Sequence, residues 1–266
     1  MDTKQFSIQI RKIILDRSYA ANVGHIGSGL SIADIMALLY GTVLRINAPH
    51  DPDRDRFILS KGHAALALYA ALHLRGWITE EELRSFGTDF TFLGVHPEHK
   101  VTGIDFCTGS LGQGLTYGAG CALAARLQKS SRRAFVLISD AECNEGSVWE
   151  AAMFAAQHKL SNLIVILDLN GQQALGYTSD ILNLSPMSAY WKTFGWDVHE
   201  VDGHDIPTME KTISNLEVSP GPPHILIAHT IFGRGVSFME KQIKWHYLPL
   251  SDSNYQQACN EVENTK

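Results

Sequence analysis

Apolar residues recur at helical spacing through the first half of the chain. They lie three or four positions apart over residues 8–19, which predicts an amphipathic helix there. The stretch 64–74 is rich in alanine and leucine and is too long for a typical strand, so it predicts a buried helix. Two pairs predict capping boxes at helix starts: Ser31 with Asp34, and Thr79 with Glu82.

The clearest unit lies in the middle of the chain. An apolar run at 134–138 leads through a polar turn into a helical pattern at 147–157, and a second apolar run follows at 163–167. This order predicts a strand, a helix and a strand, and unbroken apolar runs are typical of parallel strands buried on both faces. With further strands expected at 196–201 and 224–229, we predict a three-layer α/β fold with a mostly parallel sheet covered by helices on both faces.

A single domain is expected for most of the chain. No internal repeat, low-complexity tract or linker rich in Pro, Gly and Ser divides it. We expect residues 1–250 to form that domain. The segment 251–266 is polar, shows no periodic apolar face and ends in charges, so it is predicted to be a frayed or partner-dependent tail.

Composition narrows the class of protein. With 266 residues, 45% of them hydrophobic and 19% charged, the chain can bury a large core and does not resemble a disordered protein. Its net charge of −6 argues against a broad nucleic-acid or anionic-membrane surface. The four cysteines lack disulfide or metal-finger spacing, and the N-terminus lacks the pattern of an export signal. A cytoplasmic protein with no membrane span and no nucleic-acid partner is expected.

Two polar turns follow the predicted central strands, at 139–142 and 168–171. The carboxyl ends of neighbouring parallel strands meet at one edge of a sheet, so the turns are expected side by side. The Asp140 carboxylate and the Asn170 amide oxygen can share a hard cation such as Mg²⁺, whose shell a diphosphate would complete. Without the cation, the diphosphate would be repelled by about 1–4 kcal/mol per charge pair. The structural alternative is that Asp140 caps a helix and Asn170 forms an Asx turn.

Two glycine-rich runs precede helical patterns, at 24–29 and 109–114. Backbone N–H groups at such helix starts can face a polar ligand. The alternative, which the runs themselves leave open, is a plain turn with close helix packing.

Six short motifs occur in one order along the chain. They are Gly24-His25-Ile-Gly-Ser-Gly-Leu, Asp55-Arg-Phe-Ile-Leu-Ser-Lys-Gly-His63, His96-Pro-Glu98, Thr108-Gly-Ser-Leu-Gly-Gln-Gly114, Asp140-Ala-Glu-Cys-Asn-Glu-Gly146 and Asp168-Leu-Asn-Gly171. Together they resemble the thiamine-diphosphate-binding half of transketolase, over about residues 8–246. The resemblance implies thiamine diphosphate and Mg²⁺ as cofactors, with Ca²⁺ or Mn²⁺ as substitutes for Mg²⁺. It also implies transfer of a two-carbon ketol unit from a ketose, often phosphorylated, to an aldose.

The resemblance further implies a set of site residues. The metal ligands would be the side chains of Asp140 and Asn170 and the main-chain carbonyl of Gln172. The cofactor-binding residues would be His63, Gly109, Ser110, Leu111, Asp140, Ala141, Glu145 and Asn170, with Glu145 also organising paired cofactor sites. The catalytic residues would be His25, His63, His96 and His246, of which His25 and His96 meet the oxygens of the donor sugar. An imidazole suits this role because it can donate, accept or carry a proton near neutral pH.

A complete transketolase is more than twice as long as this chain and adds a pyrimidine-binding domain and a C-terminal domain. The resemblance therefore implies the N-terminal subunit of a split transketolase. A C-terminal transketolase subunit would supply the pyrimidine-binding domain and the activating glutamate. We expect an α2β2 heterotetramer acting on sugars or sugar phosphates, and we expect the isolated chain to be inert.

Three places depart from the family's pattern. Ser139 and Ala141 stand where the family often has glycines, which cofactor binding tolerates if φ stays negative there. Ser110 replaces a common proline. Tyr247 replaces the glycine of a Trp-His-Gly signature that contains His246.

Two other functions remain open from the sequence. A 2-oxo-acid dehydrogenase α subunit or a related synthase would use the same metal and diphosphate pair, although His25, His63 and His96 favour a polyhydroxylated sugar. A non-catalytic regulatory or scaffold subunit would keep the fold with altered cofactor turns. Residues expected only on the surface or in packing roles are His50, His73, His99, His158, His199, His204, His224, His229, Cys143 and Trp149.

Overall fold

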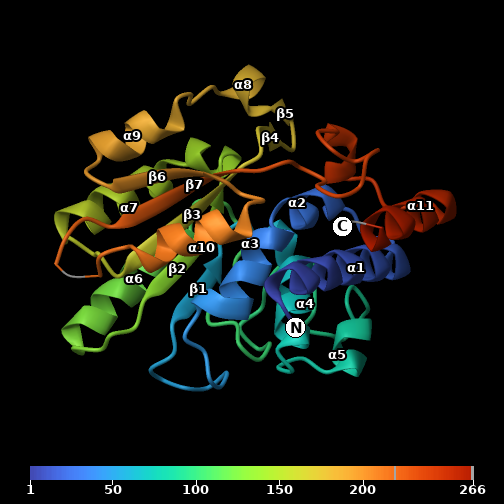
Figure 1. Cartoon of the computed structure of the whole chain (residues 1–266), viewed down its shortest axis with the longest axis horizontal. Coiled ribbons are helices and arrows are strands. Elements are labelled where there is room, and N and C mark those ends of the chain that lie inside the picture. Colours follow the sequence, from blue (N-terminus) through green and yellow to red (C-terminus); the bar gives the residue numbers. More distant parts are fainter. Residues whose placement is uncertain (219, 265–266) are drawn as a thin grey trace.

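Five parallel strands form the central sheet, in the order β1-β2-β3-β7-β6 (Figure 1). The computed structural model describes residues 1–218 and 220–264. The strands are β1 (Arg56–Leu59), β2 (Ala134–Ser139), β3 (Leu163–Leu169), β6 (Asp197–Asp202) and β7 (His224–His229). The predicted parallel sheet is confirmed, including the four strands expected from the apolar runs.

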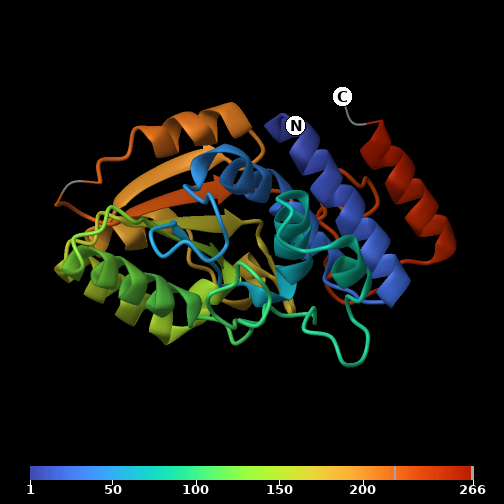
Figure 2. The same cartoon turned by 90° about the horizontal axis from the view of Figure 1, so that it is seen from below.

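Helices cover both faces of this sheet and create two separate cores. Successive side chains of a strand point to opposite faces. Phe135 and Leu137 join a core with residues of α1 (Thr3–Ala21), α3 (Ala33–Leu38), α4 (Ala65–Leu74) and α10 (Ile206–Ser214). Val136 and Ile138 join the other core, with residues of α6 (Gly114–Leu127), α7 (Gly146–Gln157) and α9 (Met187–Thr193). The three-layer arrangement is therefore confirmed (Figure 2).

The direction of the connections reverses inside the sheet. Helices α6 and α7, which precede β2 and β3, lie on one face, whereas α10, which precedes β7, lies on the other. The reversal falls between β3 and β7, which are neighbours. In open α/β sheets, ligands bind in the crevice beyond the carboxyl ends of the strands at such a reversal. The fold therefore directs attention to the carboxyl ends of β3 and β7 and of β2 beside them.

The helices near the N-terminus follow the apolar pattern closely. Helix α1 contains the predicted segment 8–19, and α4 coincides with the predicted buried helix. Helix α5 (Glu80–Arg84) begins with the predicted capping box, in which Thr79 and Glu82 exchange hydrogen bonds. These three predictions are confirmed.

The capping box predicted for Ser31 and Asp34 is wrong. Ser31 is the last residue of α2 (Ile26–Ser31), and α3 begins after Ile32 without a side-chain cap. The Ser31 hydroxyl donates to Asp168 at 2.7 Å, and Asp34 accepts two hydrogen bonds from Arg11. Both side chains are used in contacts between distant segments, which local spacing cannot reveal.

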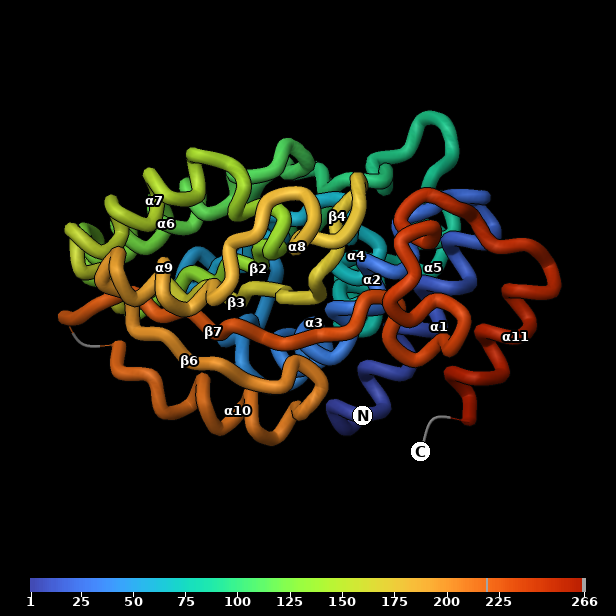
Figure 3. The backbone as a smooth tube through the Cα atoms, turned by 90° about the horizontal axis from the view of Figure 1, so that it is seen from above, coloured from blue at the N-terminus to red at the C-terminus, as the bar shows by residue number. Residues whose placement is uncertain are grey.

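The frayed tail predicted for 251–266 is also wrong over residues 252–263, while residues 265–266 lie outside the described part of the chain. Residues 252–263 form helix α11 (Asp252–Glu263), which lies along α1 (Figure 2). Ala258 and Val262 are fully buried, and the ring of Tyr255 stacks on Tyr19 with centroids 4.2 Å apart. Tyr255, Ala258, Cys259 and Val262 stand at i, i+3, i+4 and i+7, an apolar stripe that could have been recognised from the sequence. The start of α1 and the end of α11 lie on the same side of the molecule (Figure 3).

Shortening the buried side chain at the end of α11 should therefore destabilise the whole fold. Val262→Ala removes two methyl groups from a fully buried position, so we expect a loss of about 2 kcal/mol in the free energy of unfolding. Gln256→Ala, on the exposed face of the same helix, is the matched control. Urea unfolding of both variants measures the difference. Equal stabilities would mean that α11 does not dock in solution.

The remaining elements are short. They are the turns η1 (Leu39–Val43), η2 (Gly62–Ala64), η3 (Ala141–Asn144) and η4 (Ile243–His246), the helix α8 (Thr178–Ile181) and the hairpin of β4 (Gln172–Gln173) and β5 (Gly176–Tyr177). Across the described segments 1–218 and 220–264, no helix has the length and apolar character needed to cross a bilayer.

Candidate active site

The two polar turns after β2 and β3 lie side by side. Ser139 and Asp168 are register partners on the two strands. The next residue, Asp140, is only 3% exposed, and its carboxylate accepts hydrogen bonds from the N–H groups of Gly171 (2.8 Å) and Ala141 (2.9 Å). The structure thus brings the Asp140 and Asn170 turns together, as the strand ends predicted.

The Asn170 turn has a fixed geometry. Its side-chain oxygen accepts a hydrogen bond from the N–H of Gln172 at 2.9 Å, and its amide nitrogen donates to Asp168 at 2.8 Å. The first of these bonds is the Asx turn considered from the sequence. The side-chain oxygen and nitrogen of Gln172 are buried and have no hydrogen-bond partner among the described residues. Two buried polar atoms at this turn therefore remain available for hydrogen bonds that the described residues do not supply.

The electrostatics of Asp140 fit a cation. Burial, and then the charge of Asp168, raise the pKa of Asp140 to about 7, although two backbone N–H groups and Lys61 act in the opposite direction. A divalent cation would supply the positive charge that this carboxylate lacks. Carboxylate, amide and main-chain carbonyl oxygens are the ligands that Mg²⁺ prefers. The residues present therefore fit the group that the motifs imply.

A fully buried ion pair lies beside these turns. The ammonium of Lys61 is 2.5 Å from Asp168 Oδ2, and neither side chain has exposed area. Ser31 and Thr230 also donate hydrogen bonds to Asp168. Although burial opposes ionisation, the charge and hydrogen bond of Lys61 lower the pKa of Asp168. Local sequence patterns do not reveal this pair, because its two members are 107 positions apart.

Three of the four candidate catalytic histidines form a cluster. The ring centroids are 5.4 Å apart for His25 and His63, 5.1 Å for His25 and His246, and 5.3 Å for His63 and His246. His63 Nε2 lies 2.8 Å from the hydroxyl of Ser28. The Nδ1 atoms of His25 and His246 are buried and find no hydrogen-bond partner in the described part of the chain. The cluster can therefore offer hydrogen bonds to a ligand.

Burial sets the protonation of this cluster. It is the main cause that lowers the pKa of His25, of His63 and of His246, and nearby charges such as that of Lys61 act in the same direction. The pKa of His246 falls to about 4. At pH 7 the three rings are therefore neutral, and each has one N–H donor and one acceptor nitrogen.

Acid is expected to destabilise the fold through these neutral rings. The pKa of His246 is about 4 in the folded state, against a usual value of 6.5. Its contribution to stability is complete above the unfolded-state pKa and is lost as the pH falls from there towards the folded-state pKa, because only the unfolded chain takes up the proton. We expect a loss on the order of 1 kcal/mol between pH 7 and pH 5 from this residue. Urea unfolding should show a smaller loss for His246→Gln; an equal loss would contradict the assignment.

The fourth histidine lies against a glycine. A Cβ atom on Gly109 would be only 3.0 Å from Cδ2 of His96, and a Cβ atom on Gly62 would be 2.8 Å from the Gly109 nitrogen. The His96 carbonyl accepts a hydrogen bond from the Tyr69 hydroxyl at 2.8 Å. A side chain at position 62 would therefore collide with the main chain of the glycine run, whereas a Cβ atom at 109 would require the His96 ring to shift. Ser110 is exposed and Leu111 is half-buried on the same loop.

The family profile described as the thiamine diphosphate binding domain of transketolase matches residues 3–263. The chain belongs to this transketolase family. Its enzyme class is that of a transketolase-type transferase, the first of the functions expected from the motifs. The predicted fold and family are confirmed together.

Two relatives match this transketolase-family chain over almost their whole length. An apulose-4-phosphate transketolase subunit of Phocaeicola vulgatus is 39% identical over 95% of this chain and 90% of its own. The 6-deoxy-6-sulfo-D-fructose transketolase subunit SqwG of a Clostridium species is 38% identical over 99% of this chain and 98% of its own. Each is a protein that this chain resembles at the scale of a whole subunit.

Solved transketolases are longer than this chain. The transketolase of Leishmania mexicana superposes with a TM-score of 0.91 at 28% identity, covering 99% of this chain and 41% of that one. The transketolase of Campylobacter jejuni gives a TM-score of 0.91 at 29% identity, covering 99% and 43%. The chain therefore spans about two fifths of these solved enzymes.

The transketolase glycine run at 109–114 is held in place by Glu142, a residue that the sequence motifs do not single out. Buried Glu142 accepts hydrogen bonds from the Gly112 N–H (2.6 Å), from the Ser60 hydroxyl and from the Ser139 N–H (3.3 Å). The Gly114 N–H donates to Ser60 at 3.0 Å. These two glycine N–H groups therefore bind the protein itself, contrary to the expectation that the helix start would offer them to a ligand. Glu142 joins the loops after β1 and β2 to the glycine run.

The departures from the transketolase pattern are accommodated. Ser139 and Ala141 both lie outside the positive-φ region, so the condition set for them from the sequence is met. The Ser139 hydroxyl accepts a hydrogen bond from the Glu142 N–H at 3.2 Å. Tyr247 approaches the loop at Gly24, where a Cβ atom would lie 2.4 Å from the Tyr247 carbonyl oxygen. The Tyr247 ring lies beside the histidine cluster, with its centroid 5.0 Å from that of His246 and 6.2 Å from that of His25.

The other predicted positions lie around these turns. Glu145 is exposed at the start of α7. Cys143 is buried, and its carbonyl accepts a hydrogen bond from the Trp149 indole, which confirms a packing role for both. His204 also has structural partners, namely Asp34 and the N–H of Ile231.

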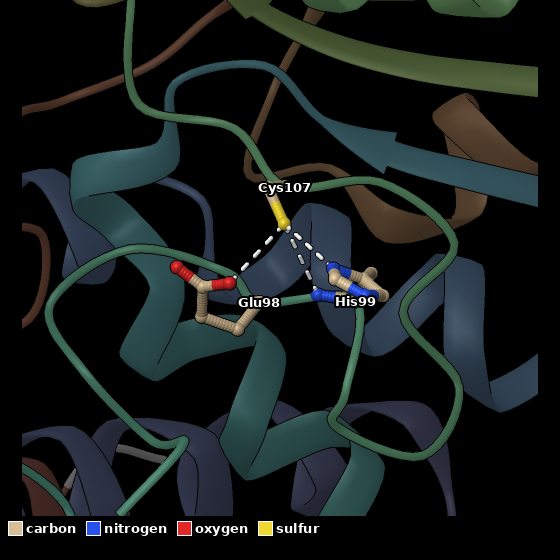
Figure 4. A group of neighbouring side chains, drawn as sticks. All are labelled: Glu98, His99 and Cys107. Carbon is tan, nitrogen blue, oxygen red and sulfur yellow. Dashed lines mark hydrogen bonds between the residues drawn. The ribbon is translucent and has the colours of Figure 1, made fainter.

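An exposed cluster closes the loop between His96 and Gly109 (Figure 4). Cys107 Sγ lies 3.2 Å from Glu98 Oε2 and 3.1 Å from His99 Nδ1, and it also accepts a hydrogen bond from the His99 main-chain N–H. All three residues are exposed. The cluster ties the two ends of this loop together beside the transketolase site.

Proposed function

We propose that this chain binds thiamine diphosphate through Mg²⁺ and, with a partner subunit, transfers a two-carbon ketol unit from a ketose to an aldose. The observation that carries the proposal is the pairing of the Asp140 and Asn170 turns at the carboxyl ends of two neighbouring parallel strands. In this assignment the side chains of Asp140 and Asn170 and the carbonyl of Gln172 bind Mg²⁺, with Ca²⁺ or Mn²⁺ as substitutes. The oxygen ligands and the raised pKa of Asp140 support a hard cation.

Bound thiamine diphosphate supplies the nucleophilic carbon and the electron sink for cleaving and forming the carbon–carbon bond. The chain's own residues bind and orient. We assign contacts with the cofactor to His63, Gly109, Ser110, Leu111, Ala141 and Glu145, beside the ligands of the metal. The neutral rings of His25 and His246, with His96, would orient the hydroxyl and carbonyl oxygens of the sugar and hold its protons.

The partner completes the site in this proposal. Two relatives of matching length carry the word subunit in their names, which supports a second polypeptide for this chain. We propose a C-terminal transketolase subunit that supplies the pyrimidine-binding domain and the activating glutamate, in an α2β2 heterotetramer with Glu145 near the paired cofactor sites. The cysteines are free thiols, which fits work in a reducing compartment such as the cytoplasm.

Reconstitution tests this function. Purified chain, Mg²⁺ and thiamine diphosphate are assayed for ketol transfer with and without the co-expressed partner, using a panel of ketoses and ketose phosphates. Apulose 4-phosphate and 6-deoxy-6-sulfo-D-fructose, from the relatives' names, belong on the panel. We expect turnover only in the complex. Turnover by the isolated chain would refute the shared site, and a complex without Mg²⁺-dependent cofactor uptake would favour a non-catalytic subunit.

Removing the His96 imidazole should affect the sugar and spare the cofactor. His96→Ala is expected to lower kcat/KM for the donor by about 10²–10⁴-fold, the range typical of a positioned acid–base or hydrogen-bonding side chain. Calorimetry should give unchanged affinity for thiamine diphosphate. His50→Ala, an exposed histidine elsewhere, is the control. Unaltered donor kinetics in His96→Ala would remove the sugar role.

A further inference from the structure

A second group of ligand-type side chains lies on β6 and β7. Asp197 and His199 occupy alternate positions of β6, so they share one face of the sheet, and His224 is the register partner of Asp197 on β7. Asp197 Oδ2 lies 2.9 Å from His199 Nε2 and 2.9 Å from His224 Nδ1. One ligand atom from each residue lies within 4.8 Å of the other two. The two neighbouring strands therefore bring two imidazoles and one carboxylate together.

The hydrogen bonding of His224 is the distinctive feature of this group. The residue is 3% exposed, its Nδ1 faces the Asp197 carboxylate, and its Nε2 faces the main-chain carbonyl of Glu217 at 3.0 Å. Both neighbours only accept, but a neutral imidazole carries a single N–H. A cation bound to Nδ1 would leave the N–H on Nε2, where the carbonyl can accept it. Histidines that bind metals usually donate their second N–H in this way.

We propose that Asp197, His199 and His224 form a site for a transition-metal cation, with Zn²⁺ the best match. Two imidazoles and one carboxylate are a common protein ligand set for zinc. Zinc bonds of about 2.0–2.1 Å at tetrahedral angles place ligand atoms about 3.3 Å apart. The two contacts of Asp197, at 2.9 Å, therefore need to lengthen by a few tenths of an ångström, and the two imidazole nitrogens already lie within 4.8 Å of each other. A cavity of about 550 Å³, lined in part by Asn215 and Glu217, leaves space for water as the fourth ligand.

This site is separate from the one assigned to thiamine diphosphate. Asp197 and His224 begin their strands, whereas the Asp140 and Asn170 turns follow the carboxyl ends of theirs. In a parallel sheet, the amino ends and the carboxyl ends of the strands lie at opposite ends of the sheet, so the two sites are far apart along the strand direction. β6 is an edge strand, so a cation here would fasten it to β7 and stabilise the fold without taking part in ketol transfer. The proposal is thus independent of the proposed function.

Metal titration of the full chain tests the site. ZnCl₂ and CoCl₂ are titrated by calorimetry and absorption with Mg²⁺ in excess, which competes for the cation position assigned to Asp140 and Asn170. We expect one equivalent of Zn²⁺ with nitrogen and oxygen ligands, and a rise in Tm of about 5 °C or more at 100-fold excess over Kd. His199→Gln, a half-buried position that tolerates the change, and Asp197→Asn should each weaken binding on the order of 100-fold.

Two matched variants make the result decisive. His229→Gln removes a second histidine–carboxylate pair between these strands, His229 with Glu200 at 3.0 Å, for which the described residues offer no third metal ligand. Cys107→Ser removes the thiol of the exposed cluster in Figure 4, the competing place for a soft metal. Both should keep the full equivalent of Zn²⁺. Three results would each overturn the site in favour of a plain ion pair. They are Zn²⁺ uptake that persists in His199→Gln, uptake that is lost in Cys107→Ser, and no uptake by the wild type at 1 mM ZnCl₂.

Discussion

Asp140→Ala is expected to abolish Mg²⁺-dependent binding of thiamine diphosphate, with affinity reduced on the order of 100-fold or more. The variant removes the only carboxylate among the three assigned ligands of the metal. It should still fold, because the raised pKa of Asp140 means that its charge is costly in the unliganded chain. Loss of the acceptor for the Gly171 and Ala141 N–H groups should cost about 1–3 kcal/mol. Calorimetry with the partner present measures the affinity, and thermal unfolding measures the cost.

Two further substitutions separate charge from structure at this position. Asp140→Asn keeps an acceptor for one of the two N–H groups, which donate to different oxygens of the carboxylate, so it should be more stable than Asp140→Ala and still bind the cofactor poorly. Asp180→Asn, an exposed carboxylate on the nearby helix α8, should bind normally. Wild-type affinity in Asp140→Ala would remove the metal assignment, and with it the central part of the proposed function.

Lys61→Met should be the most destabilising of these single changes. It leaves the Asp168 carboxylate fully buried without its ammonium partner, which typically costs 3–5 kcal/mol. A fall in Tm of roughly 10 °C is expected. Chemical denaturation, compared with the wild type in the same buffer, gives the free energy directly.

A surface pair and a double variant check the cause. Lys12→Met breaks an exposed ion pair with Glu263 and should cost less than about 1 kcal/mol. In Lys61→Met/Asp168→Asn neither member of the pair is charged, and the amide oxygen can still accept from Ser31 and Thr230, so much of the stability should return. If the double variant is no more stable than Lys61→Met, the loss comes from packing rather than from an unpaired charge.

The sheet could be predicted because its signal is local. The apolar run of β2, the helical pattern of α7 and the apolar run of β3 each lie within a few residues, and unbroken apolarity indicates burial on both faces. Helix α11 is harder to predict because most of its residues are polar, and only the stripe through Tyr255, Ala258 and Val262 is apolar. One narrow apolar stripe is enough to hold a helix on the fold when it packs against a single neighbouring helix.

The site could be predicted only in part, for the same physical reason. Asp140 and Asn170 were placed together because strand order fixes where strand ends meet. Lys61 and Glu142 were not, because their partners come from distant segments and a buried charge has no pattern along the chain. Family motifs predict that His25 and His246 share a site, but their burial and neutral state needed the structure.

The pairing of α1 with α11 affects how the chain is made. Helix α1 is synthesised well before the helix that covers one side of it, because residues 252–263 follow more than 200 positions later. Contacts between such remote segments form late and slow folding. A nascent polypeptide stalled before Asp252 would therefore expose apolar surface on α1, which chaperones and proteases recognise. The apolar face of α1 is therefore covered only after α11 has been synthesised.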